Sequence, residues 1–246
     1  MKKFLIAIFM ISAIIAENAK DPPKQNWSFN KPNGTFDRAA LQRGFQVYKE
    51  VCSACHSIKL ISFRHLKALG LNEAEIKALA SQYQIKDGPN DDGEMFERPG
   101  RPSDYIPGPY ANEKQARAAN NGSFPPDQSL IVKARAHGAD YVYAFLMGFK
   151  DAPDDFKLQQ GQYFNEFFPG NAISMAPPLK EDQVTYNDGT KATVEQMSKD
   201  VTTFLAWASE PEMEDRKRLG FKVILYLLLM TGLFYATMRR IWKDIK

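Results

Sequence analysis

The chain has 246 residues, of which 44% are hydrophobic and 25% are charged, an ordinary composition for one good-sized domain with short attachments. Its formal net charge of +3 is unevenly distributed. Residues 20–215 hold 22 Lys and Arg against 27 Asp and Glu, a net of −5, so the positive excess lies at the two ends. A nucleic-acid-binding protein places its basic residues on the folded domain, and this distribution argues against that class.

The N-terminus has the pattern of a secretory signal over residues 1–19. Two lysines precede an almost unbroken apolar run at residues 4–16, which is too short to span a bilayer comfortably. We expect cleavage after Ala16 or after Ala19, and an uncleaved anchor is the alternative. In both cases the segment that follows, residues 20–215, is predicted to be exported.

The first helix is predicted to begin near Asp37, after a polar lead-in that contains three prolines. Asp37 is a good N-cap, and Leu41 and Tyr48 lie on the apolar face of the helical pattern. Gly44 lowers the stability of this helix relative to alanine. Its presence predicts close packing of another helix at this point, with a merely tolerated glycine as the alternative.

The predicted helix leads into Cys52-Ser53-Ala54-Cys55-His56, which contains both cysteines of the chain. Cys-x-x-Cys-His is the attachment signature of c-type haem: each thiol can add across one vinyl group, and the histidine can bind the iron from the proximal side. A structural zinc site would need about four Cys or His ligands, a thioredoxin-like pair would accompany a βαβ pattern, and a disulfide between these cysteines would close almost no loop. The motif therefore predicts one covalent haem c, with Cys52 and Cys55 as thioethers and His56 as an axial iron ligand.

The rest of the exported segment is predicted to be helical or irregular. Residues 86–110 are rich in glycine and proline and acidic in their first half. Such a long loop is expected to be functional or packed near the haem, with a solvated acidic loop as the alternative. At most one small hairpin is expected, near residues 184–191. Further helices are predicted at residues 73–84, 113–120, 127–137, 140–149 and 193–209.

One transmembrane helix is predicted over residues 219–238. Residues 223–238 carry no charge, and the side chain of Lys222 can extend to the membrane surface. Lys and Arg are equally numerous on the two flanks, so the positive-inside rule does not orient the helix. The predicted signal sequence does: it places the haem domain outside and residues 239–246 in the cytoplasm.

The second axial ligand decides the class of haem protein, because one protein ligand leaves an open site for small molecules and two make an electron carrier. Methionines in helical patterns are expected to fill the core. Met175 lies instead in a segment whose two following prolines bar a helix, so its side chain can be presented at one fixed place. From the residues alone Met175 is favoured, with His65, His137 and Met95 as alternatives.

With these features the chain resembles the cytochrome c1 family, the haem subunits of cytochrome bc1 complexes. The resemblance covers nearly the whole chain after the signal sequence. Gln128 and Ala111 stand where leucine and proline are expected. Besides the haem motif, the matching stretches are Arg43-Gly44-Phe45-Gln46-Val47-Tyr48, Asp87-Gly88-Pro89-Asn90, Arg98-Pro99-Gly100, Ala118-Ala119-Asn120-Asn121-Gly122, Pro125-Pro126-Asp127, Phe168-Pro169-Gly170, Met175-Ala176-Pro177-Pro178 and Ala208-Ser209-Glu210-Pro211-Glu212.

The resemblance implies a mainly α fold: a cytochrome c-like haem domain with long inserted loops and one C-terminal transmembrane helix. It implies Met175 as the second axial ligand and Arg135 as the partner of a haem propionate, a carboxylate that a guanidinium suits. It also implies an electron-transfer subunit of quinol–cytochrome c reductase, which takes electrons from the Rieske iron–sulfur protein and passes them to a c-type cytochrome.

Further implications concern assembly and location. The expected partners are cytochrome b, the Rieske protein and a c-type cytochrome in a dimeric complex, and the chain is not expected to be an enzyme by itself. The expected location is the cell inner membrane, with a single span and the haem domain on the periplasmic side.

Three other functions remain open at this point. A haem peroxidase would need an open distal site, and therefore a Met175 that does not bind iron. A membrane-bound haem sensor would need an effector domain, whereas the predicted cytoplasmic tail has eight residues. A free-standing, membrane-anchored cytochrome would share the electron-transfer role without the complex.

Overall fold

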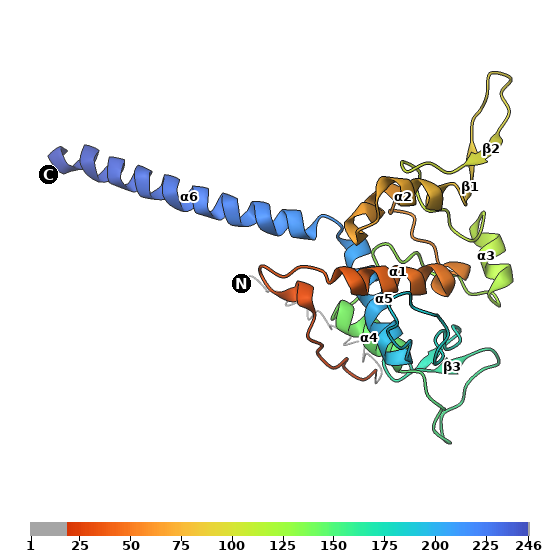
Figure 1. Cartoon of the computed structure of the whole chain (residues 1–246). Coiled ribbons are helices and arrows are strands. Elements are labelled where there is room, and N and C mark those ends of the chain that lie inside the picture. Colours follow the sequence, from red (N-terminus) through yellow and green to blue (C-terminus); the bar gives the residue numbers. More distant parts are fainter. Residues whose placement is uncertain (1–18, 246) are drawn as a thin grey trace, which may run out of the picture.

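The computed structural model describes residues 19–245 (Figure 1). The predicted signal sequence lies outside the described residues apart from Ala19, and its cleavage stays a prediction. The mainly helical architecture agrees with the predicted fold class. With η for a 3-10 helix, the helices are η1 (Ser28–Asn30), α1 (Arg38–Glu50), η2 (Cys52–Ala54), η3 (Phe63–Leu69), α2 (Glu73–Ala80), α3 (Glu113–Ala119), α4 (Ala139–Met147), α5 (Val194–Ser209), α6 (Met213–Ile241) and η4 (Trp242–Ile245), and the strands are β1 (Gln84–Asp87), β2 (Phe96–Pro99), β3 (Tyr163–Phe164) and β4 (Ala172–Ile173).

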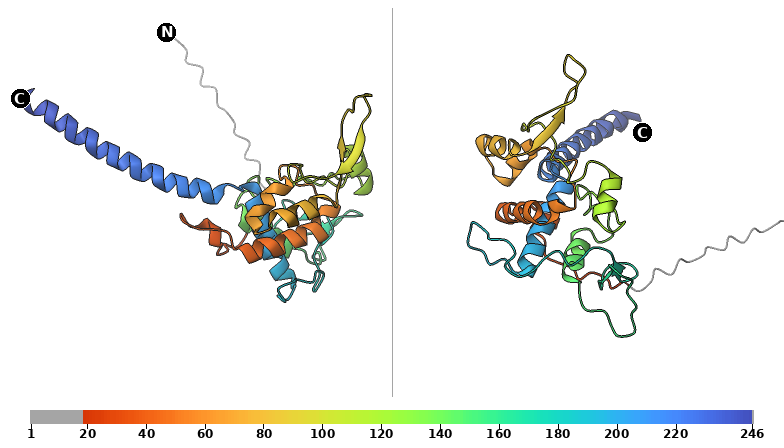
Figure 2. Two further views of the ribbon diagram at one scale, coloured as in Figure 1. Left: turned by 45° about the horizontal axis from the view of Figure 1, so that its top comes forward. Right: turned by 90° about the vertical axis from the view of Figure 1, so that its right-hand side faces the viewer.

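Helices α1 and α5 pack against each other at the centre of the helical domain (Figures 1 and 2). Asp37 caps α1 as predicted, because its carboxylate accepts hydrogen bonds from the backbone N–H groups of Ala39 and Ala40. A Cβ atom added to Gly44 would lie 2.1 Å from the backbone oxygen of Asp200 and 2.8 Å from Cβ of Phe204. The two helices therefore touch at Gly44, and the predicted close packing is confirmed.

The hydrophobic core surrounds this helix pair. Phe204 of α5 is fully buried and packs on Phe45, Tyr48 and Trp207, with ring centroids 5.5, 5.6 and 5.6 Å away. Burying an aromatic or aliphatic side chain of this size stabilises the fold by about 1.5–3 kcal/mol. The end of α1, from which the haem motif follows directly, is therefore held by the most densely packed part of the molecule.

Helix α6 leaves the helical domain as one long rod (Figure 1). It has 29 residues, its most apolar window has a mean hydropathy of 1.8, and none of that window is buried against the rest of the described chain. The helix is long enough to cross the roughly 30 Å hydrocarbon core of a bilayer. It contains the predicted span of residues 219–238 and extends it at both ends, because the charged residues that precede the span already belong to the helix.

The structure corrects the expected loop at residues 86–110. Strands β1 and β2 form an antiparallel hairpin there, with Gln84 paired to Pro99 and Asp87 to Phe96, so helix α2 ends at Ala80 rather than near residue 84. Arg98 holds the hairpin to the domain by donating to both carboxylate oxygens of Asp104, at 2.6 and 3.0 Å. A tertiary ion pair, rather than strand propensity, therefore anchors this hairpin.

The hairpin expected near residues 184–191 was wrong. No strand is present there in the described chain; Val184 and Tyr186 turn into the core, and Asp188 pairs with Arg43 at 2.7 Å. The second hairpin lies instead at β3 and β4, where Tyr163 pairs with Ile173.

The helix predicted at residues 127–137 was also wrong, because that segment forms a series of turns. The carboxylate of Asp127 accepts the N–H groups of Ser129 and of the distant Lys59, both at 2.9 Å, so it ties the start of this segment to another part of the chain. His137 adopts a left-handed conformation, with φ of 65°, which ends the segment one residue before Gly138. One local hydrogen bond and one long-range hydrogen bond of Asp127 therefore shape the start of this segment.

We expect Gly44→Ala to lower the free energy of unfolding by about 1–3 kcal/mol, because the added methyl group has to separate α1 from α5. Helix propensity alone would instead raise the free energy of unfolding by roughly 1 kcal/mol. The sign of the measured change therefore distinguishes the two effects. Denaturant unfolding of the full chain in detergent, followed by circular dichroism, measures it. Gly220→Ala is the matched control, since nothing lies within 4 Å of a Cβ added there. Equal stability of both variants would contradict the close approach.

Candidate functional site

The haem motif lies on a single turn that follows α1. The backbone oxygen of Cys52 accepts hydrogen bonds from the N–H groups of Cys55 at 3.1 Å and His56 at 2.9 Å. Ser53 ties the same turn to the end of α1 through its hydroxyl, which donates to the Lys49 oxygen at 2.7 Å. Both cysteines are half-buried free thiols. Two thiols and an imidazole are thus presented together, and the alternative disulfide is not formed.

The thiol of Cys52 does not have the character of a redox-active nucleophile. Burial raises its pKa to about 12, and the neighbouring Cys55 adds to the effect. Reactive cysteines of thiol–disulfide oxidoreductases have lowered pKa values instead. A raised pKa is unlike that of the reactive cysteine in a thioredoxin-like pair.

The imidazole of His56 is oriented by a backbone carbonyl. Its Nδ1 lies 2.8 Å from the oxygen of Pro126. A carbonyl only accepts, so Nδ1 carries the proton and Nε2 is left with a free lone pair, the arrangement found in metal-binding histidines. Burial lowers the pKa of His56, outweighing the opposing effects of the Pro126 carbonyl and Asp127. The ring is therefore neutral near pH 7, as a metal ligand must be.

Asp127 locks the loop that carries Pro126 onto the turn after the motif. Its carboxylate accepts the Ser57 hydroxyl at 2.7 Å and the Lys59 N–H at 2.9 Å, and the Gln128 N–H donates to the Ser57 oxygen at 2.8 Å. Burial by itself would raise the pKa of Asp127, but these hydrogen bonds together lower it. The residue is ionised at neutral pH, and it fixes the distance between Pro126 and His56.

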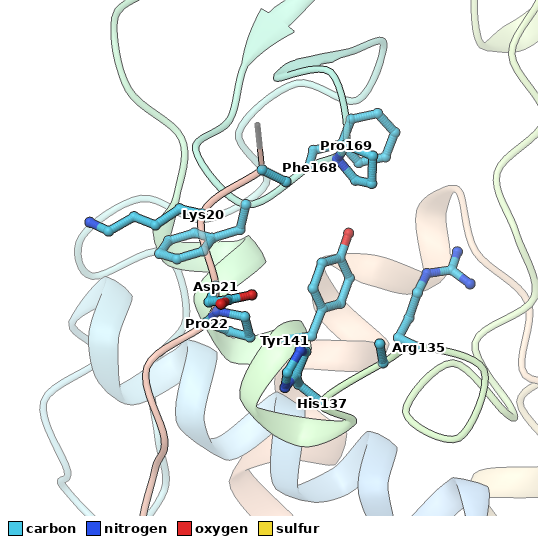
Figure 3. Close-up of a pocket in the computed structure, with 11 residues that line it drawn as sticks. Lys20, Asp21, Pro22, Arg135, His137, Tyr141, Phe168 and Pro169 are labelled. Carbon is cyan, nitrogen blue, oxygen red and sulfur yellow. The ribbon is translucent and has the colours of Figure 1, made fainter. Parts of the chain in front are cut away.

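Arg135 and Tyr141 line a cavity of about 390 Å³ between the start of α4, the chain at residues 19–22 and residues 167–169. In Figure 3 the Tyr141 ring rises from α4, with Arg135 on one side and Phe168 across the opening. Burial raises the pKa of Tyr141, while the neighbouring Arg135 opposes the rise. An exposed guanidinium, a phenol and aromatic walls are therefore brought to one place.

Met175 follows strand β4 and is half-buried. The strand is anchored through Asn171, whose side-chain amide donates to the oxygens of Asn165 at 2.9 Å and Glu166 at 3.2 Å. Asn165 is itself buried and donates to the Phe145 oxygen of α4 at 2.8 Å. The segment that presents Met175 is thus tied to the helix that carries Tyr141. Binding of iron by Met175 stays a prediction.

The alternative ligands have other surroundings. His65 accepts the N–H of Ser62 through Nδ1 at 3.1 Å as part of a helix cap. Met95 is 64% exposed next to strand β2, and His137 is exposed in a turn. His137 nevertheless lines the cavity, and its backbone oxygen accepts the Asp140 N–H of α4 at 3.1 Å, whereas Met175 is not among the cavity-lining residues.

Pro126 and Tyr141 carried no predicted functional role. The stretch Pro125-Pro126-Asp127 was noticed only as part of the resemblance, and the contact of its carbonyl with His56 spans 70 residues, so no local pattern could have revealed it. Tyr141 falls within the helix predicted at residues 140–149, and nothing in its spacing marks it as a neighbour of Arg135.

The residues present fit a covalently held haem. Two adjacent thiols and a neutral imidazole with free Nε2 supply the attachment points and an iron ligand. Arg135 lines an aromatic-walled cavity whose lining residues include neither these three side chains nor Met175. A bare metal site is less suited: within residues 19–245 no three His, Cys, Asp or Glu side chains gather to hold an ion.

Comparison with known proteins agrees with this arrangement. The model of the cytochrome C1 family matches residues 27–245. Cytochrome c1 of Rhodospirillum rubrum is 46% identical over 267 residues, which cover 100% of this chain and 98% of that protein. The Candida albicans protein named cytochrome b-c1 complex catalytic subunit, mitochondrial, is 49% identical over 232 residues, 94% of this chain and 81% of that protein.

A longer relative is also similar. The protein named cytochrome b/c1 in Bradyrhizobium diazoefficiens is 51% identical over 250 residues, which cover 93% of this chain but 36% of that protein. The chain thus spans about a third of this relative and nearly all of the Rhodospirillum rubrum protein. Because the family model and these identities extend over almost the whole sequence, the chain belongs to the cytochrome C1 family.

Proposed function

We propose that this protein is the electron-carrying subunit of a cytochrome bc1 complex, with one haem c bound through Cys52 and Cys55. The observation that carries the proposal is the single turn that presents both thiols beside His56, whose Nδ1 is held by the Pro126 oxygen at 2.8 Å. When bound, the haem supplies one-electron oxidation and reduction. The chain supplies its position, its axial ligands and the charges around it.

In this proposal His56 and Met175 are the two axial ligands. The ring of His56 is fixed by Pro126, and a thioether ligand raises the reduction potential of the haem. Arg135 places a positive charge at the cavity, where it would balance a propionate. The two ligands leave no open iron position, which favours electron transfer over the peroxidase alternative. The chain by itself does no bond chemistry.

The proposed partners are cytochrome b, the Rieske iron–sulfur protein as donor and a c-type cytochrome as acceptor, within a dimeric complex. The names of the relatives support the association with a b-c1 complex. Helix α6 supports anchoring in a membrane. We place the haem domain on the periplasmic side of the inner membrane because of the predicted signal sequence.

Purification in mild detergent tests the assignment. We expect cytochrome b and an iron–sulfur subunit to copurify with the chain, and quinol to reduce its haem in the purified complex. A chain that purifies alone with a haem that quinol cannot reduce would favour the free-standing cytochrome.

We expect Met175→Leu to keep the haem attached while its reduction potential falls by a large margin, since the thioethers depend on Cys52 and Cys55 and only the sulfur ligand is lost. Haem staining on a denaturing gel and a redox titration measure the two effects. Met95→Leu is the matched control and should leave the potential unchanged. If Met95→Leu lowered it instead, Met95 would be the ligand.

We expect Arg135→Gln to leave the haem attached and to lower its reduction potential, because removal of a positive charge near a propionate favours the more positive oxidised haem. Arg135→Lys keeps the charge but loses the planar fork, so its potential should lie between those of Arg135→Gln and the wild type. Arg117→Gln changes another exposed arginine, which pairs with Glu113, and should have no effect. A wild-type potential in Arg135→Gln would remove Arg135 from the site.

The exposed tip of the β1–β2 hairpin carries negative charges that would attract a basic electron-accepting cytochrome. Asp91, Asp92 and Glu94 are exposed and have no ion-pair partner within residues 19–245, whereas Asp87 is engaged by Arg98. Unpaired acids of one sign raise the encounter rate with a basic protein. Within the acidic first half of residues 86–110, these three carboxylates are therefore the charges that we propose attract the acceptor.

We expect electron transfer to a small basic cytochrome c to slow steeply with salt, because the screening length is about 8 Å near physiological ionic strength. Replacing Asp91, Asp92 and Glu94 by their amides should slow transfer at low salt and flatten its salt dependence. Asp151, Asp154 and Asp155 form a second exposed acidic group, and replacing them by asparagine measures how much of the steering depends on that group. A wild-type rate and salt slope in the hairpin variant would place docking elsewhere.

A further inference from the structure

One lysine at the start of α6 has surroundings unlike those of its basic neighbours. Arg216 and Arg218 are exposed, whereas Lys217 is half-buried. Its Nζ donates to three backbone oxygens: Phe29 at 2.6 Å, Lys31 at 2.8 Å and Gly34 at 3.2 Å. An ammonium group has three N–H donors, so all of them are satisfied by the backbone of one loop.

This loop, residues 27–34, forms a preformed socket. Its turns are closed by backbone hydrogen bonds from Asn30 to Trp27 at 3.2 Å and from Gly34 to Lys31 at 2.9 Å. A Cβ atom on Gly34 would lie 2.4 Å from the Ser28 oxygen, so any other residue would force the loop open. The three carbonyls that hold Lys217 are therefore aimed at one point by a tight fold of the chain.

A second set of contacts holds the same turn of α6. Glu214 accepts the Phe36 N–H at 2.8 Å and the Arg38 guanidinium at 2.5 Å. Met213 is buried in the core, and the rings of Phe29 and Phe36 pack at a tilt, with centroids 4.9 Å apart, beside the socket. Figure 1 shows this part of the chain, before α1, at the base of α6.

The socket is also bonded to the helix of the candidate site. Asp140, in the first turn of α4, accepts the Trp27 indole N–H at 2.7 Å and the Gln25 N–H at 3.0 Å. The next residue, Tyr141, lines the cavity with Arg135. A continuous set of hydrogen bonds thus leads from the membrane helix to the cavity wall.

We propose that Lys217 is a positioning residue: its seat in the socket fixes the direction in which α6 leaves the haem domain, and so places the haem pocket relative to a membrane-bound electron donor. From Leu219 onward α6 has almost no contact with the domain, because its apolar window is fully unburied. The first two turns alone therefore determine the angle. The effect on electron transfer rests on the proposed function, whereas the effect on the angle does not.

The angle is tested in the full-length, haem-loaded chain in nanodiscs. Nitroxide labels are attached through p-acetylphenylalanine at Tyr105 and Tyr226, both exposed tyrosines, and their distance distribution is measured by pulsed electron paramagnetic resonance. We expect Lys217→Met to broaden the distribution. Lys222→Met, an exposed lysine of the same helix, should leave it unchanged. An unchanged distribution in Lys217→Met would overturn the proposal.

Gly34→Ala tests the socket from its other side and serves if Lys217→Met does not accumulate. It should broaden the distribution to the same extent, and the double variant should add nothing, because residues that share one interaction are not additive. Amide hydrogen exchange at residues 29–36 should accelerate about tenfold or more in each single variant, as expected when a charge-assisted hydrogen bond is lost. Additive broadening of the distance distribution in the double variant would show that Lys217 and Gly34 do not act through the same socket.

The functional consequence is measured in the purified complex. We expect the rate of haem reduction by quinol to fall in Lys217→Met while the reduction potential stays at the wild-type value, since the haem ligands are untouched. A wild-type rate together with a broadened angle would overturn the positioning role. Failure of quinol to reduce the wild-type haem would instead overturn the proposed function and leave the angle measurement valid.

Discussion

The structure depends on the crossing of α1 and α5, where a buried ion pair closes the contact made at Gly44. Arg43 donates to both carboxylate oxygens of Asp200, at 2.8 and 3.1 Å, and Asp200 is 1% exposed. Asp200 raises the pKa of Arg43, with burial opposing it. Removing one partner of such a pair leaves an unpaired buried charge and typically costs about 3–5 kcal/mol. The pair therefore makes the crossing of the two helices sensitive to the loss of either side chain, and the haem motif follows directly from the end of α1.

Electron carriers benefit from ligands that do not move, and the candidate site gains its rigidity from segments distant in sequence. His56 is oriented by the carbonyl of Pro126, and Pro126 is held by the carboxylate of Asp127. Met175 lies on a segment tied through Asn165 to α4. Each candidate ligand is thus supported by a second layer of hydrogen bonds, the arrangement that tunes and orients metal ligands in general.

The hydrogen bonds around Lys217 hold the long apolar helix α6 in the same way, through a segment that is distant in sequence. A lysine at the end of a span is usually free to extend its side chain to the membrane surface, but this ammonium is enclosed by three backbone oxygens of the helical domain. The hydrogen bonds from Trp27 to Asp140 continue the connection to α4. Hydrogen bonds therefore connect the first turns of α6 with the helical domain and with α4, the helix that lines the cavity.

The sequence by itself determined the features that depend on short-range patterns: the haem motif at residues 52–56, the N-cap and apolar face of α1, the helix at residues 193–209, and the long apolar helix near the C-terminus. The haem motif and helical periodicity both depend on residues close together in the sequence, so a single sequence is enough to predict them. Tertiary structure alone decided the β1–β2 hairpin, the turns at residues 127–137, the carbonyl partner of His56 and the socket of Lys217. These features depend on hydrogen bonds between residues up to 188 positions apart. Where such contacts satisfy backbone groups and charges better than a helix or a free loop would, they override the secondary-structure propensity of the local sequence.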